Sequence, residues 1–283
     1  MAHKVRKIIK DAYENPKRLP APNTNLPALI DNKSKKAKPK FFTPKVIILL
    51  SLAAVVFLYA GWFALQIVEE DTQNLTSIKS WQEHTTVDPE TQEIAISPID
   101  FTNMLAINPD IKGWIHIPGT DISYPVVQSQ DNSYYLEHNA SQEENRAGAI
   151  FIDYENSSDF TDYNTIIYGH RMNNGSMFAQ LHKYEDPEFL EANQIFSIID
   201  ISGKVHNYRI FEVADVGKNL GEPVYRTDFT SPEEFLDWRQ TSCGNSVYSF
   251  IPVENSISGN VVTLSTCLQG DGSKRFIVRA VEV

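Results

Sequence analysis

Cysteine is scarce in this chain: Cys243 and Cys267 are the only two among 283 residues. Small disulfide-stabilised scaffolds use many cysteines, so the chain does not belong to that class. The seven histidines show no closely spaced pair of the kind that zinc sites use, and we predict no metal site. No internal repeat or low-complexity tract occurs. The length and the hydrophobic content of 42% allow one large domain or two small ones.

Charge is missing from one long stretch, Val46 to Val68, whose only clearly polar residues are Ser51 and Gln66. A helix of this length spans about 34 Å at ~1.5 Å per residue, enough to cross a hydrocarbon core about 30 Å thick. A buried helix would carry a polar stripe, and a signal-peptide core is shorter and nearer the N-terminus. We therefore predict a transmembrane helix at residues 46–68.

The balance of positive and negative charge differs sharply between the two sides of this stretch. Residues 1–45 carry twelve Lys/Arg and three Asp/Glu, whereas the remainder carries thirteen and thirty-three. An excess of lysine before a span places the N-terminus in the cytoplasm and the rest of the chain outside. The predicted order is a cytoplasmic basic disordered tail (1–45), the transmembrane helix (46–68), an extracellular stalk with an N-terminal helix (69–97) and a folded domain (98–283).

The outer domain is built from short apolar runs with turn residues between them. Eight β-prone runs with such turns favour a closed or nearly closed antiparallel barrel over a sandwich. Two helical insertions are expected, at 177–190 and at 231–241, the second with Ser231 as N-cap. The eight predicted strands are 113–119, 122–128, 148–153, 164–170, 194–200, 205–216, 260–267 and 275–283.

Cys267 ends one of these runs and admits three interpretations: an inert core residue, a disulfide with Cys243, or a nucleophile. A nucleophilic thiol needs a group that carries its proton and a donor that stabilises an oxyanion. His170 ends another run and precedes a turn-rich loop, and Arg275 begins the strand after the Cys267 loop. Arg279 is a rival to Arg275. The residues by themselves leave the three interpretations open.

Three short motifs resemble the signature of the sortases, the cysteine transpeptidases of Gram-positive cell surfaces. They are "TLSTC" at 263–267, "YGH" at 168–170 and "KR" at 274–275. The segment "DNSYYLEH" at 131–138 and the predicted helix at 231–241 are similar to those of class B members. The resemblance implies a mainly β fold: an eight-stranded sortase-type β-barrel with an N-terminal helix and short helical insertions, preceded by one transmembrane helix. It implies no cofactor, and a catalytic domain held outside the membrane of a Gram-positive bacterium.

The resemblance also implies roles for individual residues. Cys267 would attack a C-terminal sorting motif of a secreted protein and form a thioacyl-enzyme, with His170 moving protons and Arg275 stabilising the oxyanion. The acceptor would be an amine of lipid II or peptidoglycan, or a pilin lysine, and no nucleic acid is involved. The helix at 231–241 and the loop to about Tyr248 would wall one side of the groove. Substrate-binding residues would be Asn132, Leu136, Tyr168, Ser265 and Thr266.

One departure and two alternatives remain. Several class B enzymes have an acidic residue after the cysteine, where this chain has Leu268. A membrane-tethered cysteine endopeptidase would keep the nucleophile and use water as acceptor. A surface receptor without enzymatic activity would instead pair Cys243 with Cys267 in a disulfide.

Overall fold

The computed structural model describes residues 43–82, 99–217, 219, 221–241, 244, 246–253, 259–268 and 271–283. Ser246, Cys267, Leu268, Asp271 and Gly272 are described by their backbone alone. The chain forms two compact units, residues 1–59 and residues 60–283. Three predicted features lie partly or wholly outside the described residues: the cytoplasmic tail up to residue 42, the stalk at 83–97, and Cys243.

The first described element is the helix α2, Pro44–Gln82, of 39 residues. Its apolar part, residues 46–68, is long enough to cross a membrane. The 18-residue stretch that meets the hydropathy criterion for a span is not buried within the protein. The helix continues into the segment predicted as a stalk, where Asn74 and Trp81 are buried. Trp81 packs in one cluster with Phe101 and Met104, so the end of this helix shares the core of the second unit.

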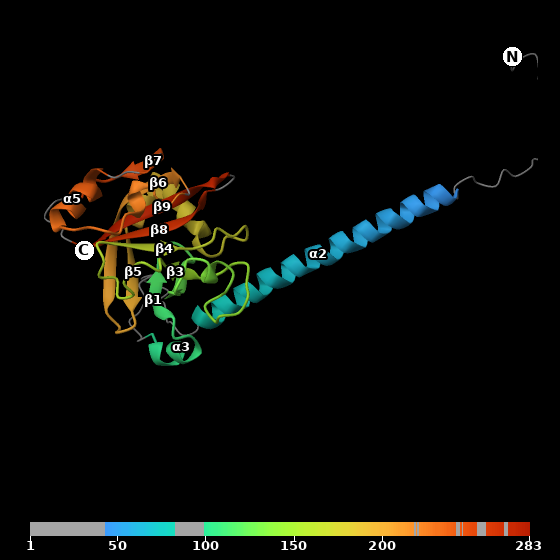
Figure 1. Cartoon of the computed structure of the whole chain (residues 1–283), viewed down its shortest axis with the longest axis horizontal. Helices are drawn as coiled ribbons and strands as arrows, with labels where there is room; N and C mark the ends of the chain where they lie inside the picture. Colours follow the sequence, from blue (N-terminus) through green and yellow to red (C-terminus); the bar gives the residue numbers. More distant parts are fainter. Residues whose placement is uncertain are drawn as a thin grey trace, which may run out of the picture. The chain divides into compact units, whose positions relative to one another are not determined.

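A single sheet of nine strands forms the second unit, in the order β5-β1-β2-β3-β4-β8-β9-β6-β7 (Figure 1). The additional pairing of β5 with β6 closes eight strands into a barrel and leaves β7 attached at the side. The predicted eight-stranded barrel is thus confirmed, and each predicted run overlaps one of its strands. The strands are β1 (Ile111–His116), β2 (Ser123–Val127), β3 (Ile150–Ile152), β4 (Asn164–Tyr168), β5 (Ile195–Asp200), β6 (Val205–Gly217), β7 (Ser246–Phe250), β8 (Val261–Leu268) and β9 (Asp271–Glu282).

The sequence predicted an antiparallel barrel, but two of the strand pairs are parallel. β2 pairs with β3, and β4 pairs with β8, in parallel. Parallel neighbours need a long connection between them, because the chain must return to the same end of the sheet. The connection from β4 to β8 supplies this length, since it contains β5, β6, β7 and several short helices.

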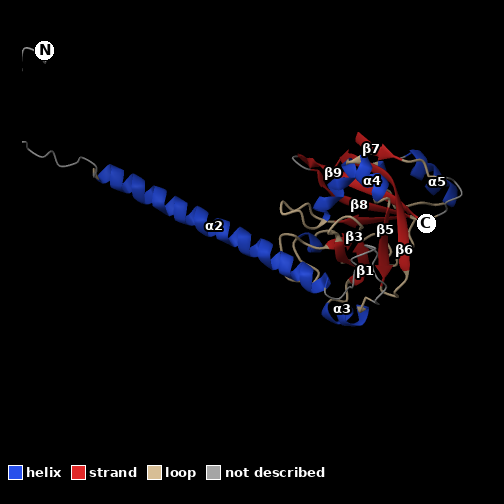
Figure 2. Ribbon diagram, turned by 180° about the vertical axis from the view of Figure 1, so that it is seen from behind, coloured by secondary structure: helices blue, strands red, loops and turns tan. Residues whose placement is uncertain are grey.

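Short helices connect the strands (Figure 2). The predicted insertion at 177–190 is divided at Asp186, whose side chain accepts a hydrogen bond from the backbone N–H of Glu188 and caps the second piece. The predicted insertion at 231–241 is one helix, and the Ser231 hydroxyl accepts from the N–H of Glu234 at 3.2 Å, as an N-cap does. The short helices are α3 (Phe101–Ile107), η2 (Tyr134–Leu136), η3 (Phe178–Glu185), α4 (Pro187–Ala192), η4 (Pro223–Tyr225) and α5 (Pro232–Thr241).

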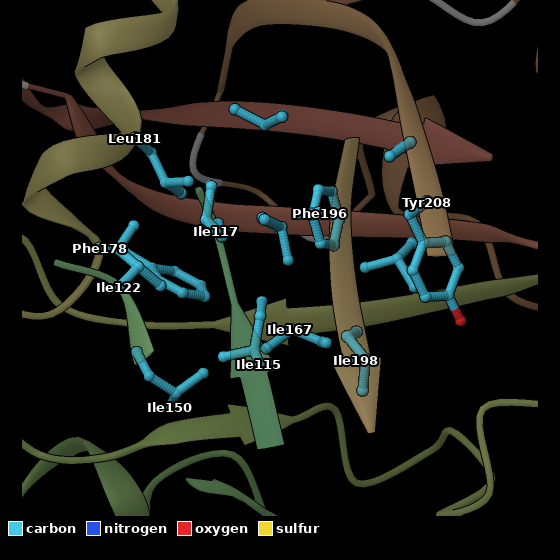
Figure 3. Packing of buried hydrophobic residues seen from close by; sticks show 14 of the residues in the cluster. Ile115, Ile117, Ile122, Ile150, Ile167, Phe178, Leu181, Phe196, Ile198 and Tyr208 are labelled. Carbon is cyan, nitrogen blue, oxygen red and sulfur yellow. The ribbon is translucent and has the colours of Figure 1, made fainter. Parts of the chain in front are cut away.

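Alternation along the strands separates two sides of the barrel wall. The inner side carries one large apolar cluster, to which most strands and η3 contribute (Figure 3). The outer side of β4, β6, β8 and β9 is covered by two smaller clusters. One contains Tyr225 of η4, and the other contains Phe235 and Trp238 of α5. Burial of each such side chain stabilises the fold by about 1.5–3 kcal/mol. The outer side of the wall is therefore where a groove can open between the coverings.

Candidate active site

The backbone register brings the three predicted catalytic positions to one rim of the barrel. In the parallel pair β4–β8, Tyr168 is the partner of Ser265, so His170 and Cys267 each follow two residues later. In the antiparallel pair β8–β9, Cys267 is the direct partner of Arg275. Neighbouring strands lie about 4.8 Å apart, so the three positions are adjacent although they are distant in sequence. The side chain of Cys267 lies outside the described residues.

His170 is held by the loop that precedes β3. Its Nε2 lies 2.8 Å from the backbone carbonyl oxygen of Leu136. A carbonyl oxygen only accepts hydrogen bonds, so Nε2 carries a proton and the neutral ring keeps its lone pair on Nδ1. The half-buried ring therefore has one nitrogen fixed by the protein and one available for proton transfer.

Arg275 is half-buried, and its Nη1 donates to the carbonyl oxygen of Lys274 at 3.1 Å. A guanidinium has five N–H groups, so this bond leaves donors that can be directed at a ligand. The rival Arg279 is fully buried and forms an ion pair with Glu212, Nη1 to Oε2, at 2.5 Å. Only Arg275 of these two lines the pocket described next.

A pocket of about 250 Å³ opens at this rim on the outer side of the barrel wall. All five predicted substrate-binding residues line it, together with His170 and Arg275, so the structure brings together every predicted site residue whose side chain it describes. Three further lining residues had not been predicted from the sequence. The lining residues are Asn132, Leu136, Phe151, Tyr168, Gly169, His170, Tyr225, Ser265, Thr266 and Arg275.

Two hydroxyls before Cys267 have different surroundings. Ser265 Oγ is 2.8 Å from the hydroxyl of Tyr225, and both groups are buried. Thr266 Oγ1 is buried and has no hydrogen-bond partner among the described residues. Buried polar atoms in folded proteins are nearly always satisfied, so the Thr266 hydroxyl is an exception among the described residues.

A buried carboxylate lies behind the pocket. Asp153 is 5% exposed, and its Oδ2 accepts hydrogen bonds from Asn132 Nδ2 and from the Tyr168 hydroxyl, each at 2.9 Å. Burial, and then the negative charge of Asp153, raise the pKa of Tyr168 well above its usual range. Tyr168 is therefore a neutral phenol that donates to Asp153 and cannot act as a base. Asp153 was not predicted as a site residue, although a carboxylate at the end of the apolar run "GAIFID" was a signal present in the sequence.

The described part of the predicted wall does not reach the groove. No described side chain of α5, and neither Val247 nor Tyr248, lines the pocket, and Tyr225 of η4 does so instead. Most of the loop before Tyr248 lies outside the described residues, so its part of the wall stays a prediction. α5 turns its apolar residues Phe235 and Trp238 towards a separate cluster with Phe211 of β6. In the described part of the chain, no group of three or more His, Cys, Asp or Glu side chains is placed to hold a metal ion.

Comparisons with known proteins agree with this geometry. A family model described as "Sortase domain" matches residues 115–283. The Sortase B of Listeria monocytogenes is 38% identical over 232 residues, which cover 81% of this chain and 92% of the relative. The Sortase B of Staphylococcus aureus is 29% identical over 243 residues, with coverages of 85% and 96%. The crystal structure of sortase B from Bacillus anthracis in complex with AAEK1 has a TM-score of 0.62 and 30% identity, and the match covers 76% of this chain and 99% of that one.

Proposed function

The chain belongs to the class B sortases, which are cysteine transpeptidases, and we propose that it cleaves a C-terminal sorting motif of secreted proteins and joins the new C-terminus to an amine of the cell wall. The observation that carries this proposal is the register that sets Cys267 opposite Arg275 and level with His170 at the mouth of a pocket. Nothing in this arrangement requires a nucleotide or a metal ion.

The first half-reaction breaks the peptide bond of the motif. Nδ1 of His170 takes the proton of the Cys267 thiol, and the resulting thiolate attacks the carbonyl carbon of the motif's threonine while the electron pair of the C=O bond moves onto the oxygen. The guanidinium of Arg275 donates hydrogen bonds to this oxyanion, which is stabilisation that grows as charge develops. The C–N bond then breaks, His170 protonates the departing amine, and a thioester remains on Cys267.

The second half-reaction makes the new amide. An acceptor amine enters, His170 removes its proton, and the amine attacks the thioester carbon until the C–S bond breaks and the thiolate returns. Nε2 of His170 is held by the Leu136 carbonyl, so Nδ1 is the nitrogen that exchanges the proton in both steps. The energy of the original peptide bond is kept in the thioester, so no nucleotide is consumed.

The pocket residues select the motif. Leu136 is 39% exposed at the rim and Phe151 and Tyr168 form its apolar floor, which suits the body of an extended peptide. The pair Ser265–Tyr225 supplies polar contacts beside Tyr168, which is the strand partner of Ser265. A solved structure of a Staphylococcus aureus sortase B–substrate complex, 27% identical to this chain with a TM-score of 0.64, supports a substrate groove in this fold.

The topology follows from the apolar helix and the charge split. We propose that residues 46–68 anchor the protein in the cell membrane of a Gram-positive bacterium, with residues 1–45 in the cytoplasm and the barrel outside. The acceptor is then an amine at the outer surface: lipid II, peptidoglycan or a pilin lysine. A crystal structure of a sortase B in complex with triglycine, 26% identical to this chain, supports an acceptor with a glycine amine.

A transpeptidation assay tests the proposal. The full-length protein in detergent micelles is given a library of fluorescent peptides with threonine fixed at the fourth position, with triglycine as acceptor. We expect a product that carries the triglycine mass and a thioacyl adduct on Cys267, and neither with Cys267→Ala. Cleavage that never yields a triglycine product would instead support the endopeptidase with water as acceptor.

The receptor alternative is tested on the same preparation. Mass spectrometry of the unreduced protein reports whether Cys243 and Cys267 are joined, and a thiol reagent reports whether Cys267 is reactive. Two free thiols with faster labelling at Cys267 would eliminate the receptor. A quantitative Cys243–Cys267 disulfide in the active preparation would contradict the proposed nucleophile.

A further inference from the structure

Asp153 is a buried acidic group that contacts two residues of the pocket wall, and the reaction does not use it directly. It follows the last residue of β3, and its backbone N–H bonds to the carbonyl oxygen of Ile166 at 2.9 Å. Tyr168 is two residues further along β4 and therefore lies on the same side of the sheet as Ile166. This diagonal position explains how the long Tyr168 side chain reaches the carboxylate.

Three donors stabilise the buried charge. Oδ2 accepts from Asn132 and Tyr168, and Oδ1 accepts from the backbone N–H of Glu155 at 3.0 Å. No Lys, Arg or His in the described ranges forms an ion pair with Asp153. A buried carboxylate held by hydrogen bonds alone depends on every donor, so both pocket residues are fixed in orientation.

The bond to Asp153 sets which atoms Asn132 can offer. Its Oδ1 already accepts the backbone N–H of Tyr154 at 3.0 Å, and one N–H of Nδ2 is donated to Asp153. These two partners leave no ambiguity about which atom of the amide is oxygen. The second N–H of Nδ2 has no acceptor among the described residues, and Asn132 lines the pocket. Asn132 therefore acts towards a ligand as a donor.

Tyr168 is set in the opposite sense. Its proton is directed at Asp153, so the phenol oxygen presents its lone pairs and no hydrogen to any other partner. A carboxylate cannot donate in return, which prevents the hydroxyl from reversing. The wall of the pocket thus offers one donor from Asn132 and one acceptor from Tyr168.

We propose that Asp153 is a positioning residue that fixes the hydrogen-bonding polarity of the pocket, so that Asn132 donates and Tyr168 accepts. One N–H beside one oxygen lone pair is the complement of one amide group, so the ligand class is an extended peptide that presents an amide carbonyl and an amide N–H at this wall. The inference rests on the proposed function for its ligand, and it concerns selection of the peptide rather than the chemistry on Cys267.

Replacing Asp153 by asparagine reverses part of this polarity while conserving shape. An amide has one oxygen and one nitrogen where the carboxylate has two oxygens, so at least one of the three donors meets an N–H. If the new nitrogen faces Tyr168, the phenol must accept from it and turns its own hydrogen into the pocket. The pocket then meets an amide N–H with a donor, which weakens binding by about tenfold.

The test measures binding separately from catalysis. The peptide that the wild type cleaves fastest in the threonine-fixed library is titrated into full-length Cys267→Ala protein, with and without Asp153→Asn. We expect Kd to rise about tenfold, and KM in the catalytically intact background to rise similarly, while kcat stays within about twofold. Combined with Tyr168→Phe, the substitution should weaken binding by less than the product of the two separate factors, because both disrupt one hydrogen bond.

Asp162→Asn is the matched control. Asp162 Oδ2 also accepts from a side-chain amide, Asn156 Nδ2 at 2.8 Å, and from a backbone N–H, but it does not line the pocket. We expect this variant to leave Kd and KM unchanged. An active wild type with an unchanged Kd in both Asp153→Asn and Tyr168→Phe would refute the inference, whereas a wild type that cleaves no peptide would refute the proposed function instead.

Should Asp153→Asn fail to fold, Tyr168→Phe carries the test alone. It keeps the ring and Asp153, and it removes the oxygen that Asp153 orients. A Kd equal to that of the parent Cys267→Ala protein would then overturn the proposal, and a Kd about tenfold higher would support it.

Discussion

Two arginines on one strand of this barrel have opposite fates. On β9, Arg279 is paired across the sheet with Thr263, and Arg275 is paired with Cys267. Arg279 is fully buried, forms an ion pair with Glu212 and stacks its guanidinium over Trp238 at 4.3 Å from the ring centroid. Arg275 is half-buried and is bonded to the carbonyl of Lys274 beside an open pocket.

The difference lies in what covers each end of the strand. α5 and its aromatic residues cover the Arg279 end of the strand. The charge of Arg279 is therefore buried and serves the stability of the fold. At the Arg275 end, η4 lies beside an open pocket. The charge of Arg275 therefore remains available to a substrate. The same residue type on the same face therefore stabilises the protein at one position and serves the reaction at the other.

The largest effect on turnover is expected at the open end of the strand, where Cys267 and His170 lie next to Arg275. Cys267→Ala and His170→Ala each remove a group that forms or breaks a covalent bond, so turnover should fall below detection. The thermal midpoint should change little, because neither substitution touches the Arg279 cluster. Mass spectrometry for the thioacyl adduct and a melting curve measure both. Retained turnover in Cys267→Ala would end the assignment of the nucleophile.

The next largest effect concerns the closed end of the strand, where Arg279 stabilises the fold. Arg279→Ala leaves Glu212 buried without its partner, which costs about 3–5 kcal/mol of unfolding free energy. Urea unfolding monitored by tryptophan fluorescence measures this cost. Replacing the pair by apolar residues, Arg279→Met with Glu212→Leu, should recover most of the lost stability. A single Arg279→Ala variant as stable as wild type would show that this end is not structural.

Arg275→Ala tests the open end in the complementary way. If its guanidinium serves the oxyanion, kcat/KM should fall about 10²–10³-fold. The unfolding free energy should stay within about 0.5 kcal/mol of wild type, as for a surface substitution. Peptide cleavage rates and urea unfolding, run on the same preparations as Arg279→Ala, compare the two arginines directly. A large loss of stability with little loss of rate would reverse the comparison.

The smallest expected effect concerns the cover of the open end. Tyr225→Phe removes the hydroxyl that contacts Ser265 and keeps the ring, so we expect a loss of about 0.5–1.5 kcal/mol in stability and a rise of a few fold in KM. Peptide titration together with thermal melting measures both. An unchanged KM would show that η4 covers the barrel without shaping the pocket.

Much of the fold was predictable because alternating apolar residues with turns between them carry their own signal. Each of the eight barrel strands overlaps a predicted run, and α5 begins directly after its predicted cap, Ser231. β7 was missed because it is a short strand at the edge of the sheet, and its ladder with β6 depends on a distant partner. α3 was missed because seven residues show too little helical periodicity, although the Asp100 side chain caps it.

The site residues also divide into those that the sequence predicted and those that depend on contacts between distant segments. The positions of His170, Cys267 and Arg275 were expected from short motifs, and the register of β4, β8 and β9 places them together. Tyr225 was not predictable, because its role arises from a contact with Ser265 forty residues later in the sequence. Asp153 was visible as a strand-end carboxylate, but its partners Asn132 and Tyr168 are joined to it only by the folded sheet.

The parallel pairing of β4 with β8 has a consequence for when the enzyme becomes active. His170 and Cys267 meet only when β8 pairs with β4, across a long connection that contains β5, β6 and β7. Contacts between segments so far apart form slowly, since the entropy of closing the long loop is lost before the contact stabilises the chain. We therefore expect the reactive thiol to gain its partners among the last steps of folding, so that a partly folded chain carries no assembled catalyst.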